Sequence, residues 1–151
     1  MIKIITVGFL KELYLKDAIA EYLKRIKKYT NIEMIELKDE GIVEPKKALQ
    51  LEEERIMKQI NDKDYIITLE IEGKELSSVE FADKMNHIMI ENSNILFIIG
   101  GSYGLSDTIK ERANFHLSFS KMTFPHQLFR VLLLEQIYRA YKINHNESYH
   151  K

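Results

Sequence analysis

Two stretches in the last third of the chain combine residue types that suit a small-molecule site. The apolar run 95–99 opens into Gly100-Gly101-Ser102-Tyr103-Gly104, where glycines without a Cβ let the backbone approach a ligand closely. The loop from Phe119 to Phe124 mixes two phenylalanines and a methionine with hydroxyl groups and one lysine. An adenine ring between apolar walls, read by main-chain groups, suits this loop, and a tightly packed structural loop suits it equally. A plain turn likewise accounts for the glycines.

Other chemistries find less support in the sequence. The glycine stretch is not Gly-x-Gly-x-x-Gly and no Walker A signature is present, which argues against an ordinary Rossmann nucleotide enzyme. No nucleophile elbow supports hydrolysis. His145 and His150 lack cysteine or carboxylate partners at metal-binding spacing, so we expect no metal. The closing Tyr149-His150-Lys151 retains a titratable ring where an ordinary tail is frayed and polar, which makes His150 either functional or a surface residue.

Length and composition indicate one cytoplasmic domain that spans residues 1–151. The absence of cysteine excludes disulfides and thiolate chemistry and suits a reducing compartment. No apolar run reaches the length of a membrane span without a charge, so we expect no membrane contact. The net charge of −1 argues against a protein that coats nucleic acid through bulk charge. Residues 95–151 nevertheless carry 7 Lys and Arg against 4 Asp and Glu.

Strand and helix patterns alternate along the whole chain. Strands are predicted at residues 2–7, 31–37, 65–71, 95–99 and 114–118, the third of them closed by Glu72-Gly73. Helices are predicted at 14–29, 45–61, 105–112 and 125–143, and another follows the capping box Ser77…Glu80. The acidic run from Glu52 to Glu54 is expected on a solvated face. The alternation predicts an α/β domain with a mainly parallel five-stranded sheet.

The last predicted helix is apolar on most of its circumference, which requires two buried surfaces. One is the sheet, and the second is most simply another subunit, so we expect a homodimer; a helix fully buried within the monomer is the alternative. Ligands of open α/β sheets collect beyond the carboxyl ends of the strands. Three predicted loops lie there, after Leu69, Ile99 and Ser118.

Four segments together resemble a known family. They are residues 97–104, residues 117–127, Glu135-Gln136-Ile137-Tyr138-Arg139-Ala140 and the closing Tyr149-His150-Lys151. These closely resemble the ribosomal large-subunit pseudouridine N3-methyltransferases, often called methyltransferase H. The resemblance implies a knotted SPOUT-type fold with a C-terminal trefoil and a homodimer. It also implies S-adenosylmethionine-dependent methylation of N3 of a pseudouridine in 23S-type ribosomal RNA, on assembled ribosomes. It is weakest from Lys38 to Glu54, where this chain is shorter.

The resemblance also assigns roles to residues at matching motif positions. The cofactor pocket would be lined by Leu69, Gly100, Phe119, Ser120, Lys121, Met122, Thr123 and Phe124. Substrate would be faced by His126, Arg139 and Lys151, and catalysis would involve His150, Tyr149 and Arg130. His150 would accept the N3 proton, while Arg130 or Lys151 would stabilise the imide anion or hold phosphate. The alternatives are an inactive dimeric ribosome-binding module and a SPOUT enzyme that acts on another RNA.

Overall fold

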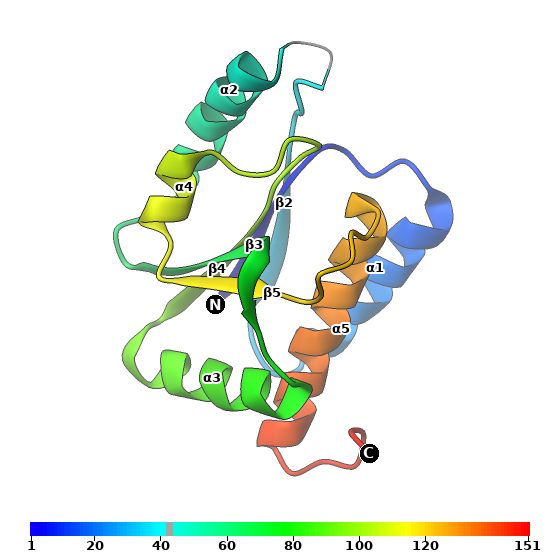
Figure 1. Cartoon of the computed structure of the whole chain (residues 1–151). Helices are drawn as coiled ribbons and strands as arrows, with labels where there is room; N and C mark the ends of the chain where they lie inside the picture. Colours follow the sequence, from blue (N-terminus) through cyan, green and yellow to red (C-terminus); the bar gives the residue numbers. More distant parts are fainter. Residues whose placement is uncertain (42–43) are drawn as a thin grey trace.

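The computed structural model describes residues 1–41 and 44–151, and its centre is a five-stranded sheet in which all paired strands are parallel (Figure 1). The strands are β1 (Ile2–Val7), β2 (Ile32–Leu37), β3 (Asp64–Glu75), β4 (Asn94–Ile99) and β5 (Phe115–Ser118). Their spatial order is β2-β1-β4-β3-β5. Strand β4 is buried from Ile95 to Ile99, as a continuous apolar run covered on both faces requires. The predicted five-stranded sheet is confirmed.

Helices cover both faces of the sheet (Figure 1). On one face α1 (Leu13–Ile26) and α3 (Ser78–Glu91) flank α5 (His126–Asn144), over a core centred on Phe97, Leu133 and Ile137. On the other face α2 (Pro45–Met57) packs beside α4 (Asp107–Arg112) over a smaller core that contains Ile56 and Ile109. The capping box predicted at the start of α3 is present, since Glu80 N–H donates to Ser77 Oγ and Ser77 N–H donates to Glu80 Oε1.

Strand β3 does not end at Glu72-Gly73, and that part of the prediction is wrong. It continues to Glu75, and its pairing with β5 shifts register between Leu69 and Lys74. The glycine permits this second pairing, because a Cβ on Gly73 would lie 2.7 Å from the carbonyl carbon of Leu117. The same short strand β5 is therefore paired twice by β3, at the edge of the sheet where the candidate site lies.

Helix α2 corrects the expectation that residues 52–54 form a solvated face. Glu52 is only 3% exposed, and its Oε2 accepts a hydrogen bond from Glu40 N–H at 2.9 Å. Glu53 accepts one from the hydroxyl of Ser106 at 2.6 Å, which joins α2 to the segment before α4. Glu52 is buried because residues four apart lie on the same side of a helix, and it shares the buried side of α2 with Ala48 and Ile56. Ile42 and Val43, within the short region 38–54, lie outside the described residues.

Helix α5 buries most of its apolar circumference within its own chain. It packs between α1 and α3, and Leu133, Leu134, Ile137 and Ala140 are buried between these helices and the sheet. The side chain of Leu128 at its first turn remains 39% exposed. The sequence predicted that α5 is buried against the sheet and against a second surface, and helices α1 and α3 of the same chain supply much of that second surface. In the described part of the chain no helix is long and apolar enough to cross a membrane.

Candidate functional site

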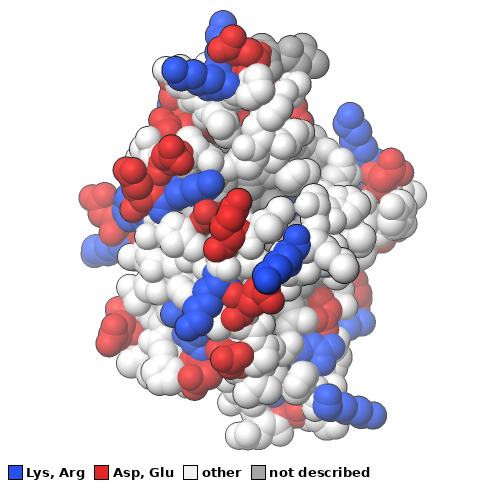
Figure 2. Space-filling view, viewed as in Figure 1, with Lys and Arg blue, Asp and Glu red and all other residues white. Residues whose placement is uncertain are grey.

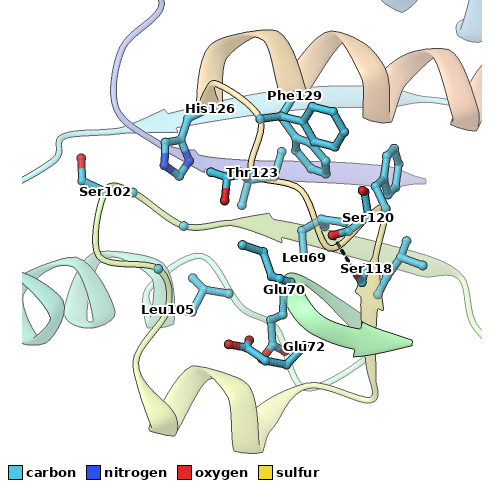
Figure 3. Close-up of a pocket in the computed structure, with 18 of the residues that line it drawn as sticks. Leu69, Glu70, Glu72, Ser102, Leu105, Ser118, Ser120, Thr123, His126 and Phe129 are labelled. Carbon is cyan, nitrogen blue, oxygen red and sulfur yellow. Dashed lines mark hydrogen bonds between the residues drawn. The ribbon is translucent and has the colours of Figure 1, made fainter. Parts of the chain in front are cut away.

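A pocket of about 430 Å³ lies beyond the carboxyl ends of β4 and β5 and beside the middle of β3, where the loop predicted after Leu69 is in fact strand (Figure 3). Its walls come from residues 69–72, 99–105, 117–120 and 122–124, from Lys110 and from the start of α5. Because β4, β3 and β5 are neighbours and parallel, the carboxyl ends of β4 and β5 lie level with residues 69–72 of β3 at one edge of the sheet. The pocket has the size usual for small-molecule sites, about 300 to 1,000 Å³.

The glycine loop after β4 forms one wall of the pocket. Gly104 N–H donates to the carbonyl of Gly101 at 3.0 Å, and Gly104 has a φ of 77°, which favours glycine. A Cβ on Gly100 would lie 2.5 Å from the carbonyl oxygen of Gly104. Gly100 therefore allows the loop to close on itself, a more specific role than general backbone access. The hydroxyl of Tyr103 donates to the carbonyl of Gly41 at 3.3 Å.

The loop from Phe119 to Phe124 forms the opposite wall. Its turn is fixed by two short-range bonds, from Ser118 Oγ to the carbonyl of Ser120 at 3.1 Å and from Met122 N–H to Ser120 Oγ at 3.0 Å. The ring of Phe129 on α5 contacts those of Phe119 and Phe124, with centroids 4.8 and 6.1 Å away. The predicted cofactor residues that line the pocket are Leu69, Gly100, Phe119, Ser120, Met122, Thr123 and Phe124. Lys121 is exposed and lies outside this lining.

Charged side chains on the lower wall in Figure 3 were not predicted from the sequence. Glu70 and Glu72 follow Leu69 along β3, and Lys110 reaches the pocket from α4, with its Nζ 3.8 Å from Glu70 Oε1. Two neighbours hold the carboxylate of Glu70 in place. It accepts a hydrogen bond from Thr68 Oγ1 at 2.6 Å, and it contacts the ring of His116. Thr68 and Glu70 are two residues apart and therefore lie on the same face of β3, and this spacing is the signal in the sequence for the contact between them.

His126, predicted to face substrate, lines the pocket at the first residue of α5. Desolvation of its ring and, second, the nearby positive charge of Arg130 lower the pKa of His126, while the backbone of Gly100 opposes the shift. The net shift favours the neutral form of the ring. Neutral imidazole offers one donor and one acceptor to a ligand.

Arg130 is 1% exposed and lies beneath the site, outside the pocket lining. Its Nη1 is 3.0 Å from Glu36 Oε2 on β2, and its Nη2 donates to the carbonyl of Gly8 at 2.8 Å. Burial lowers the pKa of Arg130, and the Glu36 carboxylate opposes that shift. The Nε of Arg130 has no hydrogen-bond partner among the described residues. This geometry joins α5 to the ends of β1 and β2.

The closing residues lie against α5 of their own chain, near its carboxyl-terminal half (Figure 1). The hydroxyl of Tyr149 donates to Glu135 Oε1 at 3.1 Å, and the guanidinium of Arg139 lies 4.8 Å from the centre of the Tyr149 ring. Arg139 Nη1 donates to His150 Nδ1 at 3.0 Å. Burial and, second, the bond to Glu135 raise the pKa of Tyr149 to about 12. The structure thus brings Arg139, Tyr149 and His150 together, outside the lining of the 430 Å³ pocket, with Lys151 exposed beside them.

Within residues 1–41 and 44–151 no group of three His, Asp or Glu side chains is arranged to hold a metal ion. The polar chemistry at the described pocket consists instead of two carboxylates, one ammonium, one imidazole, hydroxyls and backbone groups. These groups favour an organic ligand that carries charges of both signs.

Comparison with known proteins shows the family of the chain. Residues 1–150 match the family described as predicted SPOUT methyltransferase. Ribosomal RNA large subunit methyltransferase H of Clostridium acetobutylicum and its namesake from Streptococcus pneumoniae are each 50% identical, with 99% of both chains covered. A probable methylase family protein from Haemophilus influenzae has a similar fold, with a TM-score of 0.59 at 15% identity over 99% of this chain and 70% of that one. The chain belongs to the SPOUT methyltransferase family, as its motifs predicted.

Proposed function

We propose that this protein uses S-adenosylmethionine to methylate N3 of a pseudouridine in large-subunit ribosomal RNA, on assembled ribosomes. Full-length similarity to proteins named for large-subunit ribosomal RNA methylation supports the substrate class. The observation that carries the proposal is the pocket built from the glycine loop and residues 119–124, because the motif positions that resemble the family's cofactor site converge there.

The residues of the pocket fit S-adenosylmethionine. Phe119, Phe124 and Leu105 offer apolar surface for adenine, and the loops beside them offer main-chain donors and acceptors. The cofactor's sulfonium and ammonium carry positive charge, which Glu70 and Glu72 complement. Lys110 complements its carboxylate. When bound, S-adenosylmethionine supplies an electrophilic methyl group to a nucleophile placed in line with the carbon–sulfur bond.

The protein's remaining task is to prepare the acceptor nitrogen, which carries a proton. His150 is the proposed base; in the docked tail Arg139 donates to its Nδ1, so His150 must leave Arg139 before that nitrogen can accept the N3 proton. Tyr149 holds the tail through Glu135. Arg139 and Lys151 are proposed to contact the anionic acceptor or phosphate, and His126 to orient substrate from the pocket side. Arg130 is proposed as a positioning residue, because its guanidinium is held by Glu36 and Gly8.

We further propose that the protein acts as a homodimer in the cytoplasm. Large apolar side chains are exposed at the start of α1, where Leu13 is 71% exposed and Tyr14 is 68% exposed, and the nearby Lys11 N–H donates to Gln127 Oε1 at the start of α5. Such a patch is typical of a protein interface. On the face shown in Figure 2, basic and acidic side chains are interspersed, which suits a ribosomal partner that supplies surfaces other than bare phosphate.

Three measurements test the proposal. Mass mapping of large-subunit ribosomal RNA, from cells with and without the gene, should show loss of one methyl group on a pseudouridine; an unchanged map removes the proposed substrate. Titration calorimetry should detect S-adenosylmethionine binding to the folded protein, and its absence would favour a non-enzymatic ribosome-binding module. Methylation of transfer RNA alone would indicate the other RNA class. His150→Ala should bind the cofactor normally but turn over slowly, and full turnover would exclude His150 as the base.

A further inference from the structure

The carboxyl-terminal end of α1 carries a basic surface, made of Lys24, Arg25, Lys27 and Lys28, that none of the roles assigned above uses. The three lysines are exposed, and none of them forms an ion pair within the described residues. Lys24 lies three residues before Lys27 and four before Lys28, so these like charges are neighbours on the helix surface and repel one another. The dipole of α1, which ends at Ile26, offsets part of this repulsion. An anionic partner would offset the rest.

Arg25 presents an oriented guanidinium with unused donors. Its Nε donates to Glu21 Oε1 at 3.0 Å, and its Cζ lies 5.4 Å from the centre of the Tyr22 ring and 5.7 Å from that of Tyr138. These contacts orient the guanidinium, whereas its two Nη groups form no hydrogen bond within the described residues. The side chain is 40% exposed. A planar guanidinium with free Nη groups can bind a phosphate through two parallel hydrogen bonds.

The basic surface is continuous with the tail that holds the proposed base. Helix α1 packs along α5 (Figure 1), and the Tyr138 ring, over which Arg25 lies, contacts the ring of Tyr149 with centroids 5.0 Å apart. Tyr149 directly precedes His150 in the chain. A nucleic-acid strand carries one phosphate per nucleotide. A strand whose acceptor base lies near the tail therefore has its flanking phosphates within reach of the basic surface.

We propose that the basic surface docks the phosphodiester backbone of ribosomal RNA beside the acceptor nucleotide. Arg25 binds one phosphate through both Nη groups, and the three lysines neutralise neighbouring phosphates as point charges. The identity of the RNA rests on the proposed function. Because the net charge of the chain is −1, attraction to RNA has to come from a local cluster of this kind and not from bulk charge. Phosphate contacts position a nucleic acid without reading its bases, so the basic surface contributes affinity and not the choice of nucleotide.

The test measures the Kd for large ribosomal subunits by filter binding, at salt concentrations from about 50 to 200 mM. The triple variant Lys24→Gln, Lys27→Gln, Lys28→Gln should raise this Kd by about tenfold or more, and should lower the slope of log Kd against log salt by about 2 to 3. Its kcat at saturating ribosomes and its Kd for S-adenosylmethionine should stay within about twofold of wild type, because the lysines lie outside the cofactor pocket. Arg25→Lys keeps the charge but loses the planar guanidinium, and should raise the Kd for the subunits by about three- to tenfold.

The matched control is Lys46→Gln, Lys47→Gln, Lys58→Gln, which removes the same charge from exposed lysines on α2 and at its carboxyl-terminal cap, over the other face of the sheet. It should leave both the Kd and the salt slope unchanged.

Three results would overturn the proposal. They are an unchanged Kd in the variant of the basic surface, equal losses in both triple variants, which would assign the attraction to overall charge, and a loss on assembled subunits that is absent with large-subunit RNA freed of protein, which would assign the basic surface to a ribosomal protein. If the wild type binds the RNA with the expected slopes but methylates none of it, the proposed activity fails and the docking surface stands.

Discussion

Replacement of Arg130 by methionine would separate a positioning role from direct action on substrate. Methionine fills the volume of the arginine stem but removes the bonds to Glu36, Gly8 and Val7. Two of these bonds are short, 3.0 and 2.8 Å, and the third is 3.4 Å. Hydrogen bonds that involve a charged partner each contribute about 1.5 to 3 kcal/mol.

The net loss is smaller than the sum of these contributions. The Glu36 side chain is 35% exposed and regains water in the variant, so its part is discounted. Removal of the charge also ends the desolvation of a guanidinium whose Nε has no partner among the described residues. We expect a loss of about 3 kcal/mol in the free energy of unfolding, which in a chain of this length lowers Tm by about 6 to 12 °C.

Urea unfolding at fixed protein concentration measures this loss, with calorimetry of cofactor binding on the same samples. Arg130→Lys keeps the charge and should lose less. Arg25→Met, which removes an exposed pair with Glu21, should leave the urea midpoint unchanged. If Arg130→Met were as stable as the wild type, bound cofactor normally and still lost methyl transfer, a positioning role would be refuted and contact with substrate favoured.

Three other changes give distinct outcomes. S-adenosylmethionine at about 100 times Kd should stabilise the wild-type protein by about 2.7 kcal/mol, and Gly100→Val, whose side chain meets the backbone of Gly104, should show no such gain in a thermal melt. Burial raises the pKa of Glu52, so its contribution to stability is present in acid and is lost as pH rises through that pKa; Glu52→Gln should flatten this fall in urea unfolding between acid and neutral pH. Tyr149→Phe loses the bond to Glu135 and should speed hydrogen exchange in residues 145–151, whereas unchanged exchange would mean that the tail is held by other contacts.

The pattern of apolar residues predicted most elements of the fold well, because each of these elements buries one face or both at the spacing of a helix or a strand. The β-branched runs of β1 and β4 and the Ser77 capping box lie where local chemistry placed them. The end of β3 was predicted wrongly because Glu72-Gly73 is typical of a turn when only its local sequence is considered. Only the nearby backbone of β5, which passes close to Gly73, makes it a register shift.

The site was predicted in part for a related reason. Loops after parallel strands meet at one edge, which located the pocket around Gly100 and residues 119–124. Glu70 and Lys110 were missed because they belong to elements far apart in sequence, and their proximity depends on the strand order. The buried state of Arg130 was likewise not readable, since its partners Glu36 and Gly8 lie more than ninety residues earlier.

The segment from Leu117 to Phe119 borders the 430 Å³ pocket and also a second cavity of about 340 Å³, whose other walls come from the start of α3 and the middle of α5. If molecules occupy both spaces, the effect of one on the order of this segment changes the affinity of the other by the same factor, because binding linkage is reciprocal. A cofactor that orders Phe119 would therefore tighten binding in the second cavity, and an occupant of that cavity would tighten the cofactor equally. Such cooperativity would arise from one shared strand end, without any movement of domains.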